Sequence, residues 1–417
     1  MLDRITPPAP KPIENVLSKK PQIGTSSGFP TLVYGESKLP IILFELILES
    51  GKWFEDSIGI SYFTSKMLSE GCQRLDGGEI AQSFETLGSH LEVASGADFV
   101  SFKLYSLRRN FEVSLALLQE VLWTPTFPEK EFNTLKQIRI HNLEYRLAKN
   151  SEYATMKFFE QLMGASNPYG HLITVPEIES IGLDNVRHYN ANYFFNKPKA
   201  MVVGDLGENE HRLIENFFAS FKTVEHAERR VFPDQDPSKC FEERGGATQA
   251  SIRLGKLSIS RDHRDIHLLS IANMTLGGYF GSRLMKNIRE DKGLTYGINS
   301  SLSHLNHASY FQISAEVEQQ NIDLTLKEIQ VELNRLANEF ISDTEIETVK
   351  NYSKGKFLMS IDSPLAILSL FRSQFLLGQG LNYHDDFLAT LEEIRPIQIS
   401  EMVRKYLTEM TVEVLIK

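Results

Sequence analysis

Two hydrogen-bond donors, Arg289 and Tyr296, stand seven residues apart in the second half of the sequence. A guanidinium and a phenol can both donate to a carbonyl oxygen and to the oxyanion that develops when that carbonyl is attacked. A purely structural interpretation also exists, in which Arg289 pairs with Glu290 or Asp291 on an exposed helix face and Tyr296 is a half-buried strand residue. On composition alone the structural interpretation is favoured.

A second constellation, His263 and His267, has the spacing that can place two imidazoles on one helix face as metal ligands. The pair lies at the start of a predicted helix that runs to Leu276, where aspartates and polar residues are what a capped helix start needs. No third ligand stands at a standard spacing. We therefore interpret this segment as a capped, solvent-exposed helix start.

Several segments together form a pattern that covers nearly the whole chain. They are ESGK at 49–52, MLSEG at 67–71, EIAQSFETLG at 79–88, LWTPTF at 122–127, NPYG at 167–170, MVVGD at 201–205, GGYFGSRL at 277–284 and IREDKGLTYG at 288–297. In these segments the chain resembles the M16 (insulinase, pitrilysin and mitochondrial-processing) peptidase family.

The resemblance identifies positions where the family binds zinc. Members carry H-x-x-E-H on a helix, in which two histidines hold the metal and the glutamate acts on the bound water. The matching positions here are Tyr62, Ser65 and Lys66, and the family's third ligand, a glutamate about eighty residues further on, falls on Asn142. A phenol is a poor zinc ligand, an ammonium repels the cation, and a serine cannot replace the carboxylate. We expect a degenerate zinc site and no metal in this chain.

The family's second signature is kept. In the family an arginine and, seven residues later, a tyrosine reach from the second half toward the peptide bound at zinc in the opposing half. The resemblance therefore implies that Arg289 and Tyr296 bind substrate and support the transition state in trans. The family also presents an edge strand with an Asn-Ala pair that holds peptide by strand addition. Glu92 and Val93 stand there in this chain, so we expect a weakened peptide-docking edge.

Composition excludes several classes of protein. With 54 acidic and 44 basic residues the net charge is −10, which argues against a nucleic-acid surface. Two distant cysteines, Cys72 and Cys240, suit a reducing compartment. No apolar run has membrane-spanning length, and the start of the chain is Pro-rich instead of carrying an apolar signal segment. We expect a cytoplasmic chain with no membrane partner. Residues 7–12 are expected to be extended, either as a disordered tail or as an arm that packs along a partner or the other half, and the tail is favoured.

The order of strands and helices recurs, which indicates a duplication. The matching segments are 102–106 with 311–315, 110–122 with 321–333, 129–132 with 343–346, and 200–204 with 412–416. At 417 residues more than one hydrophobic core is expected. The pattern predicts an α+β fold with two homologous domains, each an antiparallel sheet covered by helices, which together form one half of an M16-type clamshell. The expected limits are 1–221 for the domain with the degenerate zinc site, 222–246 for a linker, and 247–417 for the domain with the Arg–Tyr pair.

Two functions are compatible with these observations. In the first, the chain is the non-catalytic subunit of a heterodimeric zinc peptidase, inactive alone, with zinc in a partner subunit that cleaves the peptide substrate. A homodimer is an alternative assembly. In the second, the chain is a structural or peptide-binding scaffold that resembles the core subunits of a respiratory complex and takes no part in hydrolysis. The retained Arg289 and Tyr296 favour the first.

Overall fold

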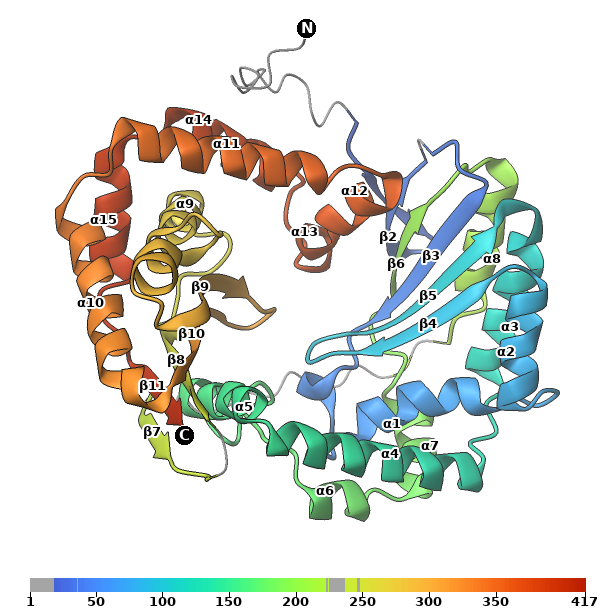
Figure 1. The fold of residues 1–417 in the computed structure, drawn as a ribbon. Helices are drawn as coiled ribbons and strands as arrows, with labels where there is room; N and C mark the ends of the chain where they lie inside the picture. Colours follow the sequence, from blue (N-terminus) through green and yellow to red (C-terminus); the bar gives the residue numbers. More distant parts are fainter. Residues whose placement is uncertain (1–18, 36, 223, 225–236, 246–247) are drawn as a thin grey trace, which may run out of the picture.

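The computed structural model describes residues 19–417 except 36, 223, 225–236 and 246–247. The expected Pro-rich arm and residues 225–236 of the expected linker lie outside the described residues. The chain forms two sheets on opposite sides of the molecule, each with its own set of helices (Figure 1).

The first sheet has six strands in the order β1-β2-β6-β3-β5-β4, and the second has five in the order β7-β11-β8-β10-β9. The strands of the first are β1 (Gln22–Ser26), β2 (Phe29–Tyr34), β3 (Ile41–Leu48), β4 (His90–Ser95), β5 (Val100–Leu107) and β6 (Lys199–Val203). Those of the second are β7 (Lys239–Glu242), β8 (Gln249–Leu257), β9 (Thr295–His304), β10 (Ser309–Glu318) and β11 (Val412–Ile416).

The second sheet repeats the order of the first without β1. Phe102 on β5 and Phe311 on β10 therefore occupy equivalent strands, as the repeat in the sequence predicted. Each sheet departs from a purely antiparallel pattern at one pair, because β2 and β6 run parallel, and so do β7 and β11. The reason is that the closing strand of each half inserts between the first strand of the repeat and the next, antiparallel to the latter.

Helices connect and flank the strands in each half of the chain. In the first half they are α1 (Ile60–Met67), α2 (Gly77–Thr86), α3 (Phe111–Trp123), α4 (Glu129–Ala148), α5 (Asn150–Met163), α6 (Val175–Ser180), α7 (Leu183–Asn192) and α8 (Glu208–Ala219). In the second they are α9 (Ile266–Gly277), the π-helix η4 (Met285–Asp291), α10 (Ile322–Asn338), α11 (Asp343–Met359), α12 (Pro364–Leu370), α13 (Arg372–Leu376), α14 (Tyr383–Glu393) and α15 (Pro396–Tyr406).

The two halves exchange helices, which the sequence did not lead us to expect. Helix α5 leaves the first half and packs on the second sheet, where Phe158 shares a buried cluster with Val414. In return α12 and α13 pack on the first sheet, where Phe371 is fully buried in a cluster with Val203 (Figure 1). Each sheet is therefore covered on both faces, which ties the two halves together.

This double cover explains the apolar sequence of β3. Strand β3 reads IILFELIL, and seven of its eight residues are buried. A run without polar alternation is what a strand buried on both faces requires. Its one charged residue, Glu45, is 3% exposed and accepts from the Arg372 guanidinium at 3.1 Å. The exchanged helix thus supplies the partner that a buried carboxylate needs.

Among the residues that the structure describes, no helix is both long and apolar enough to cross a bilayer.

Candidate functional site

Helix α1, which carries the positions of the lost zinc motif, is a well-anchored buried helix. Its start is fixed by Glu55, whose two carboxylate oxygens accept from the main-chain N–H groups of Gly59 at 2.8 Å and Ser61 at 2.9 Å. Burial raises the pKa of the Glu55 carboxyl, and these two hydrogen bonds oppose that rise. Gly59 has φ +86°, a left-handed conformation that favours glycine. The scaffold of a metal helix is therefore preserved although its ligands are not.

The three motif positions make contacts that have nothing to do with a metal. The Arg139 guanidinium of α4 lies 4.3 Å from the centre of the Tyr62 ring. Ser65 is fully buried, and its hydroxyl donates to the main-chain oxygen of Tyr62 at 2.9 Å. The Lys66 ammonium donates to the main-chain oxygen of Val93 on β4 at 2.6 Å. Each side chain has a structural partner in place of a zinc ion.

The fourth expected position, Asn142, lines the smaller of two cavities that lie beside α1. Its side chain is exposed on α4, and the α4 residue that contacts Tyr62 is Arg139, three residues earlier. The sequence prediction missed Arg139. It could have been found by following the helical face that joins Arg139 to Leu143, because residues four apart point the same way.

Two adjoining cavities lie beside α1, of about 280 and 210 Å³, and share Lys52, Arg139 and His171. Zinc in proteins is held by thiolate, imidazole and carboxylate groups. The basic side chains here repel a cation, and the one carboxylate, Glu55, already accepts two main-chain bonds. Within the described ranges no group of three or more His, Cys, Asp or Glu side chains could hold a metal ion. These residues do not fit zinc.

The edge strand beside α1 is intact as backbone. Strand β4 pairs with β5 alone and is the last strand of its sheet. Glu92 points to solvent and forms an ion pair with Lys103 at 3.2 Å, while the carbonyl of Val93 accepts from Lys66. The departure from the family pattern therefore lies in the side chains around the strand.

The structure places Arg289 on the π-helix η4, where its guanidinium lies 4.6 Å from the centre of the Phe280 ring. The alternative pairing with Glu290 or Asp291 is not formed, and no other described residue makes an ion pair with Arg289. Rings hold a guanidinium by cation–π attraction and leave its N–H donors available. The arginine is thus positioned but keeps its hydrogen-bonding capacity.

Tyr296 is 87% exposed on β9, the edge strand of the second sheet, so the half-buried alternative is wrong. No hydrogen bond joins Tyr296 to Arg289 among the described residues. The two are related through an open groove of about 480 Å³ lined by Phe280, the ring under Arg289, and by Gly297, the neighbour of Tyr296. Neither Arg289 nor Tyr296 itself lines this groove; the structure places each donor next to a residue of the groove, and Tyr296 on an open strand edge.

The glycines at the end of α9 allow this arrangement. A Cβ on Gly277 would lie 2.7 Å from the main-chain nitrogen of Ser300 on β9. Only glycine permits that approach of helix and strand.

The two histidines considered in the sequence do not form a metal pair. Helix α9 begins at Ile266, so His263 precedes it, and its ring accepts from the N–H of Asp265 at 3.0 Å. His267 lies inside the helix with its ring centre 4.6 Å from that of Tyr383. Asp265 makes no cap bond, because its carboxylate is taken by Tyr406 and Lys405 of α15. The expectation of a side-chain cap was wrong.

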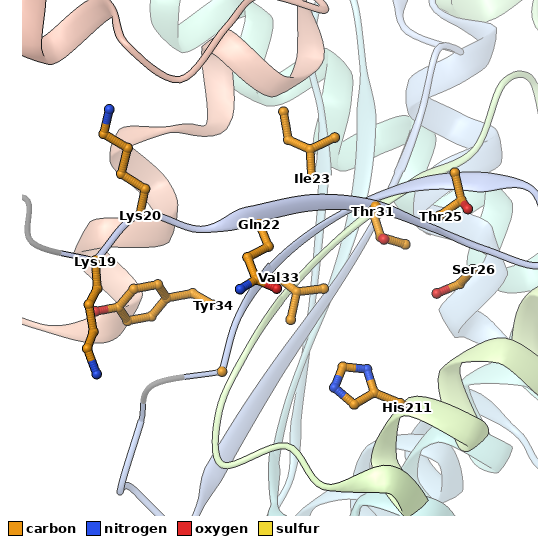
Figure 2. Close-up of a pocket in the computed structure, with 12 residues that line it drawn as sticks. Lys19, Lys20, Gln22, Ile23, Thr25, Ser26, Thr31, Val33, Tyr34 and His211 are labelled. Atoms are coloured by element: carbon orange, nitrogen blue, oxygen red, sulfur yellow. The ribbon is translucent and has the colours of Figure 1, made fainter.

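A separate hollow of about 550 Å³ lies on β1 and β2 and is lined by Lys20, Thr25 and His211 among others (Figure 2). The Lys20 ammonium already bonds Asn382 at 2.9 Å and Asp385 of α14. This hollow therefore lies next to a contact between the two halves. It shares no lining residue with the groove lined by Phe280 and Gly297.

Comparison with known proteins places these features in a family. Residues 43–166 match the model described as insulinase (peptidase family M16), and residues 181–353 match the peptidase M16 inactive domain. The uncharacterized zinc protease YmxG of Bacillus subtilis (strain 168) is 24% identical over 359 residues, 84% of this chain and 86% of that one. The non-peptidase homolog YmxG of Helicobacter pylori is 24% identical over 396 residues, 90% of this chain and 88% of that one.

Solved structures of other proteins share this fold. A crystal structure of a peptidase M16 inactive domain from Pseudomonas fluorescens superposes with a TM-score of 0.86 and 26% identity, over 95% of this chain and 98% of that one. A protease from Helicobacter pylori shares the fold with a TM-score of 0.85 and 19% identity, over 95% and 99%.

Fold and site together define a two-domain α+β protein of the kind that forms half of an M16 clamshell. The chain belongs to the M16 peptidase family, and within it to the inactive type.

Proposed function

We propose that this chain is the non-catalytic subunit of a heterodimeric M16 zinc peptidase. In this proposal the partner subunit holds the zinc and cleaves the peptide, and this chain contributes Arg289 and Tyr296 to the substrate in trans. The chain itself holds no cofactor and is inactive alone. We also propose the domain limits 1–221, 222–246 and 247–417, and a cytoplasmic location consistent with two free cysteines, Cys72 and Cys240.

The observation that carries the proposal is the contrast between the two sites. The side chains at the zinc-motif positions of α1 are occupied by partners within the chain. Tyr296, in contrast, is 87% exposed, and the Arg289 guanidinium rests on a ring with no carboxylate to neutralise it. Donors kept available beside an open strand edge suit a peptide carbonyl. In this proposal these donors act together with a zinc ion that is bound by another chain.

A scaffold without a hydrolytic role is the second candidate. It is favoured by the stacking of Arg289 on Phe280, since that contact alone also gives the arginine a structural role. The two candidates differ in what happens to a peptide when a zinc-bearing partner is present.

The test is reconstitution. The chain is co-expressed with an H-x-x-E-H chain of similar length, ideally one encoded beside its gene, and each chain is also prepared alone. The proposal expects a stable complex with one zinc per heterodimer and chelator-sensitive peptide hydrolysis that needs both chains. A complex that forms but cleaves no faster than the zinc-bearing chain alone supports the scaffold.

A further inference from the structure

The two cavities beside α1 contain cations that lack anionic partners. Lys52 stands at the mouth of both cavities, and Arg139 lines both from α4. Neither forms an ion pair with any described residue, and the Arg139 guanidinium lies 4.3 Å from the centre of the Tyr62 ring. Arg146, two helical turns further along α4, lines the smaller cavity and forms an ion pair with Glu152 at 3.2 Å. We refer to Lys52, Arg139, Arg146 and Tyr62 as the cation pocket.

The acidic groups at hand form no ion pair with Lys52 or Arg139, although the charge of Glu55 acts on Lys52. The carboxylate of Glu55 is 4% exposed and bonds the N–H groups of Gly59 and Ser61. Glu177 is taken by His171, whose Nε2 lies 3.0 Å from it. Both carboxylates therefore have other partners, and Lys52 and Arg139 stay unpaired.

Burial and mutual repulsion both act on the cations of the pocket. Burial lowers the pKa of Lys52, and the nearby Arg139 and Arg146 lower it further while Glu55 opposes them. Burial likewise lowers the pKa of Arg139, with Arg146 adding to the effect. Crowded cations of this kind gain most from an anion that enters between them.

The other residues that line the larger cavity indicate what kind of molecule carries the anionic group. Ile58, Pro168 and Ile173 make part of the wall apolar, and Ser95 and Gly96 connect the larger cavity to the end of the edge strand β4. A small apolar wall beside a strand end fits a peptide residue better than a free inorganic ion. The planar guanidinium of Arg139 can hold a carboxylate through two parallel hydrogen bonds.

We propose that the cation pocket, built on the former metal helix, binds a carboxylate of a peptide through Lys52 and Arg139. The carboxylate is either the C-terminus of the peptide or an Asp or Glu side chain. The identity of the ligand as a peptide rests on the proposed role in peptide processing, whereas the pocket itself rests on the unpaired cations. The degenerate zinc site thus becomes a site that holds substrate without cutting it.

The test uses the full chain alone, without a partner, and fluorescence anisotropy of three labelled hexapeptides of alanine and leucine. One has a free C-terminal carboxylate, one has a C-terminal amide, and one has the amide and a single internal glutamate. Inorganic phosphate serves as competitor. The variants are Lys52→Gln and Lys52→Gln with Arg139→Gln, and the matched control is Lys130→Gln with Lys286→Gln, which removes two exposed, unpaired cations elsewhere.

We expect at least one carboxylate-bearing peptide to bind about 10-fold or more tightly than the neutral peptide, with displacement by phosphate. Which of the two carboxylate-bearing peptides binds shows whether the pocket recognises a C-terminal carboxylate or a side-chain carboxylate. The single variant should weaken binding, the double variant should abolish the preference, and the control should keep it. Equal binding of all three peptides, no binding of any peptide, or an unaffected double variant overturns the proposal. Because no hydrolysis is measured, a failed reconstitution of the peptidase leaves this result standing by itself.

Discussion

The joint between the two halves should depend on one hydrogen bond from Tyr169 to Asp98. Asp98 lies in the hairpin between β4 and β5, is 9% exposed, and accepts from the Tyr169 hydroxyl at 2.5 Å. The same hydroxyl accepts from the N–H of His307 at 3.1 Å, in the equivalent hairpin of the second half. The ring of Trp53 stacks on that of His307 at 4.1 Å. The β4–β5 hairpin and the equivalent β9–β10 hairpin are thus both hydrogen-bonded to the Tyr169 hydroxyl.

The variant Tyr169→Phe removes a donor from a buried carboxylate and an acceptor from a buried N–H. A hydrogen bond to a charged group contributes about 1.5–3 kcal/mol and one between neutral groups about 0.5–1.5 kcal/mol. We therefore expect the free energy of unfolding to fall by about 2–3 kcal/mol where the Asp98 carboxyl is ionised and by about 1 kcal/mol where it is protonated, so that the loss is larger at pH 7.5 than at pH 4.5.

The pH dependence has a definite sign. Burial raises the pKa of Asp98, and the bond from Tyr169 opposes the rise. A carboxyl whose pKa is raised on folding contributes stability below its unfolded pKa of about 3.9 and loses it as the pH rises through the folded pKa. Without Tyr169 the folded pKa rises further, so the loss of stability in the variant grows toward neutral pH.

The assay is urea unfolding of both proteins at the two pH values, followed by tryptophan fluorescence, because Trp53 reports on the joint. The matched control is Tyr153→Phe, which removes a bond of 2.8 Å to the more exposed Glu242 and should cost less than about 1 kcal/mol at either pH. An equal loss in the two variants, or a loss at Tyr169 that does not change with pH, would refute the reasoning.

Three further predictions concern the exchanged helices and the lost metal site. Phe371→Ala should lower the free energy of unfolding by about 3–5 kcal/mol, because the ring is fully buried where α12 and α13 cover the first sheet, whereas Leu358→Ala, 43% exposed, should change it little in the same urea titration. The chain alone should contain no stoichiometric zinc by elemental analysis and show no chelator-sensitive peptidase activity; one tightly held zinc per chain would contradict this. Restoring the motif with Tyr62→His, Ser65→Glu and Lys66→His should still give no tight zinc site, because the third ligand position holds the neutral amide of Asn142 and α4 adds the Arg139 guanidinium beside the motif; a stoichiometric zinc in this triple variant would show that the surroundings matter less than we infer.

The sequence allowed the repeated strand–helix order to be predicted because that order is local. Alternating burial marks β5 and β10, and the helices that follow begin at Glu129 and Asp343 as expected. The exchange of α5 for α12 and α13 could not be predicted in this way, because periodicity shows which face of a helix is apolar but not which sheet covers it. The continuous apolar run of β3 was the one local sign of a sheet covered on both faces.

The site could be predicted from the sequence where a residue type by itself excludes zinc binding. It could not be predicted where the role of a side chain depends on its contacts in the folded chain. Tyr62, Ser65 and Lys66 rule out zinc by their chemistry alone, and the structure adds only their partners. The exposure of Tyr296 and the stacking of Arg289 depend on the edge position of β9 and on the π-helix, and neither leaves a clear periodic signal. The spacing of the family's third ligand points to Asn142 and not to Arg139, which lies three residues earlier on α4.

The central claim is that Arg289 and Tyr296 act on a substrate held by another subunit. The most direct measurement is kcat for peptide hydrolysis by the reconstituted complex, with Arg289→Ala and Tyr296→Phe compared with the exposed controls Arg264→Ala and Tyr145→Phe. Loss of one oxyanion donor costs about 10²–10³ in turnover. We predict a loss of that size for the first two variants with subunit association unchanged, and wild-type rates for the controls. Arg289→Lys should recover the rate only in part, because an ammonium lacks the planar fork of a guanidinium. Undiminished hydrolysis by both Arg289→Ala and Tyr296→Phe would contradict the account and leave the scaffold role.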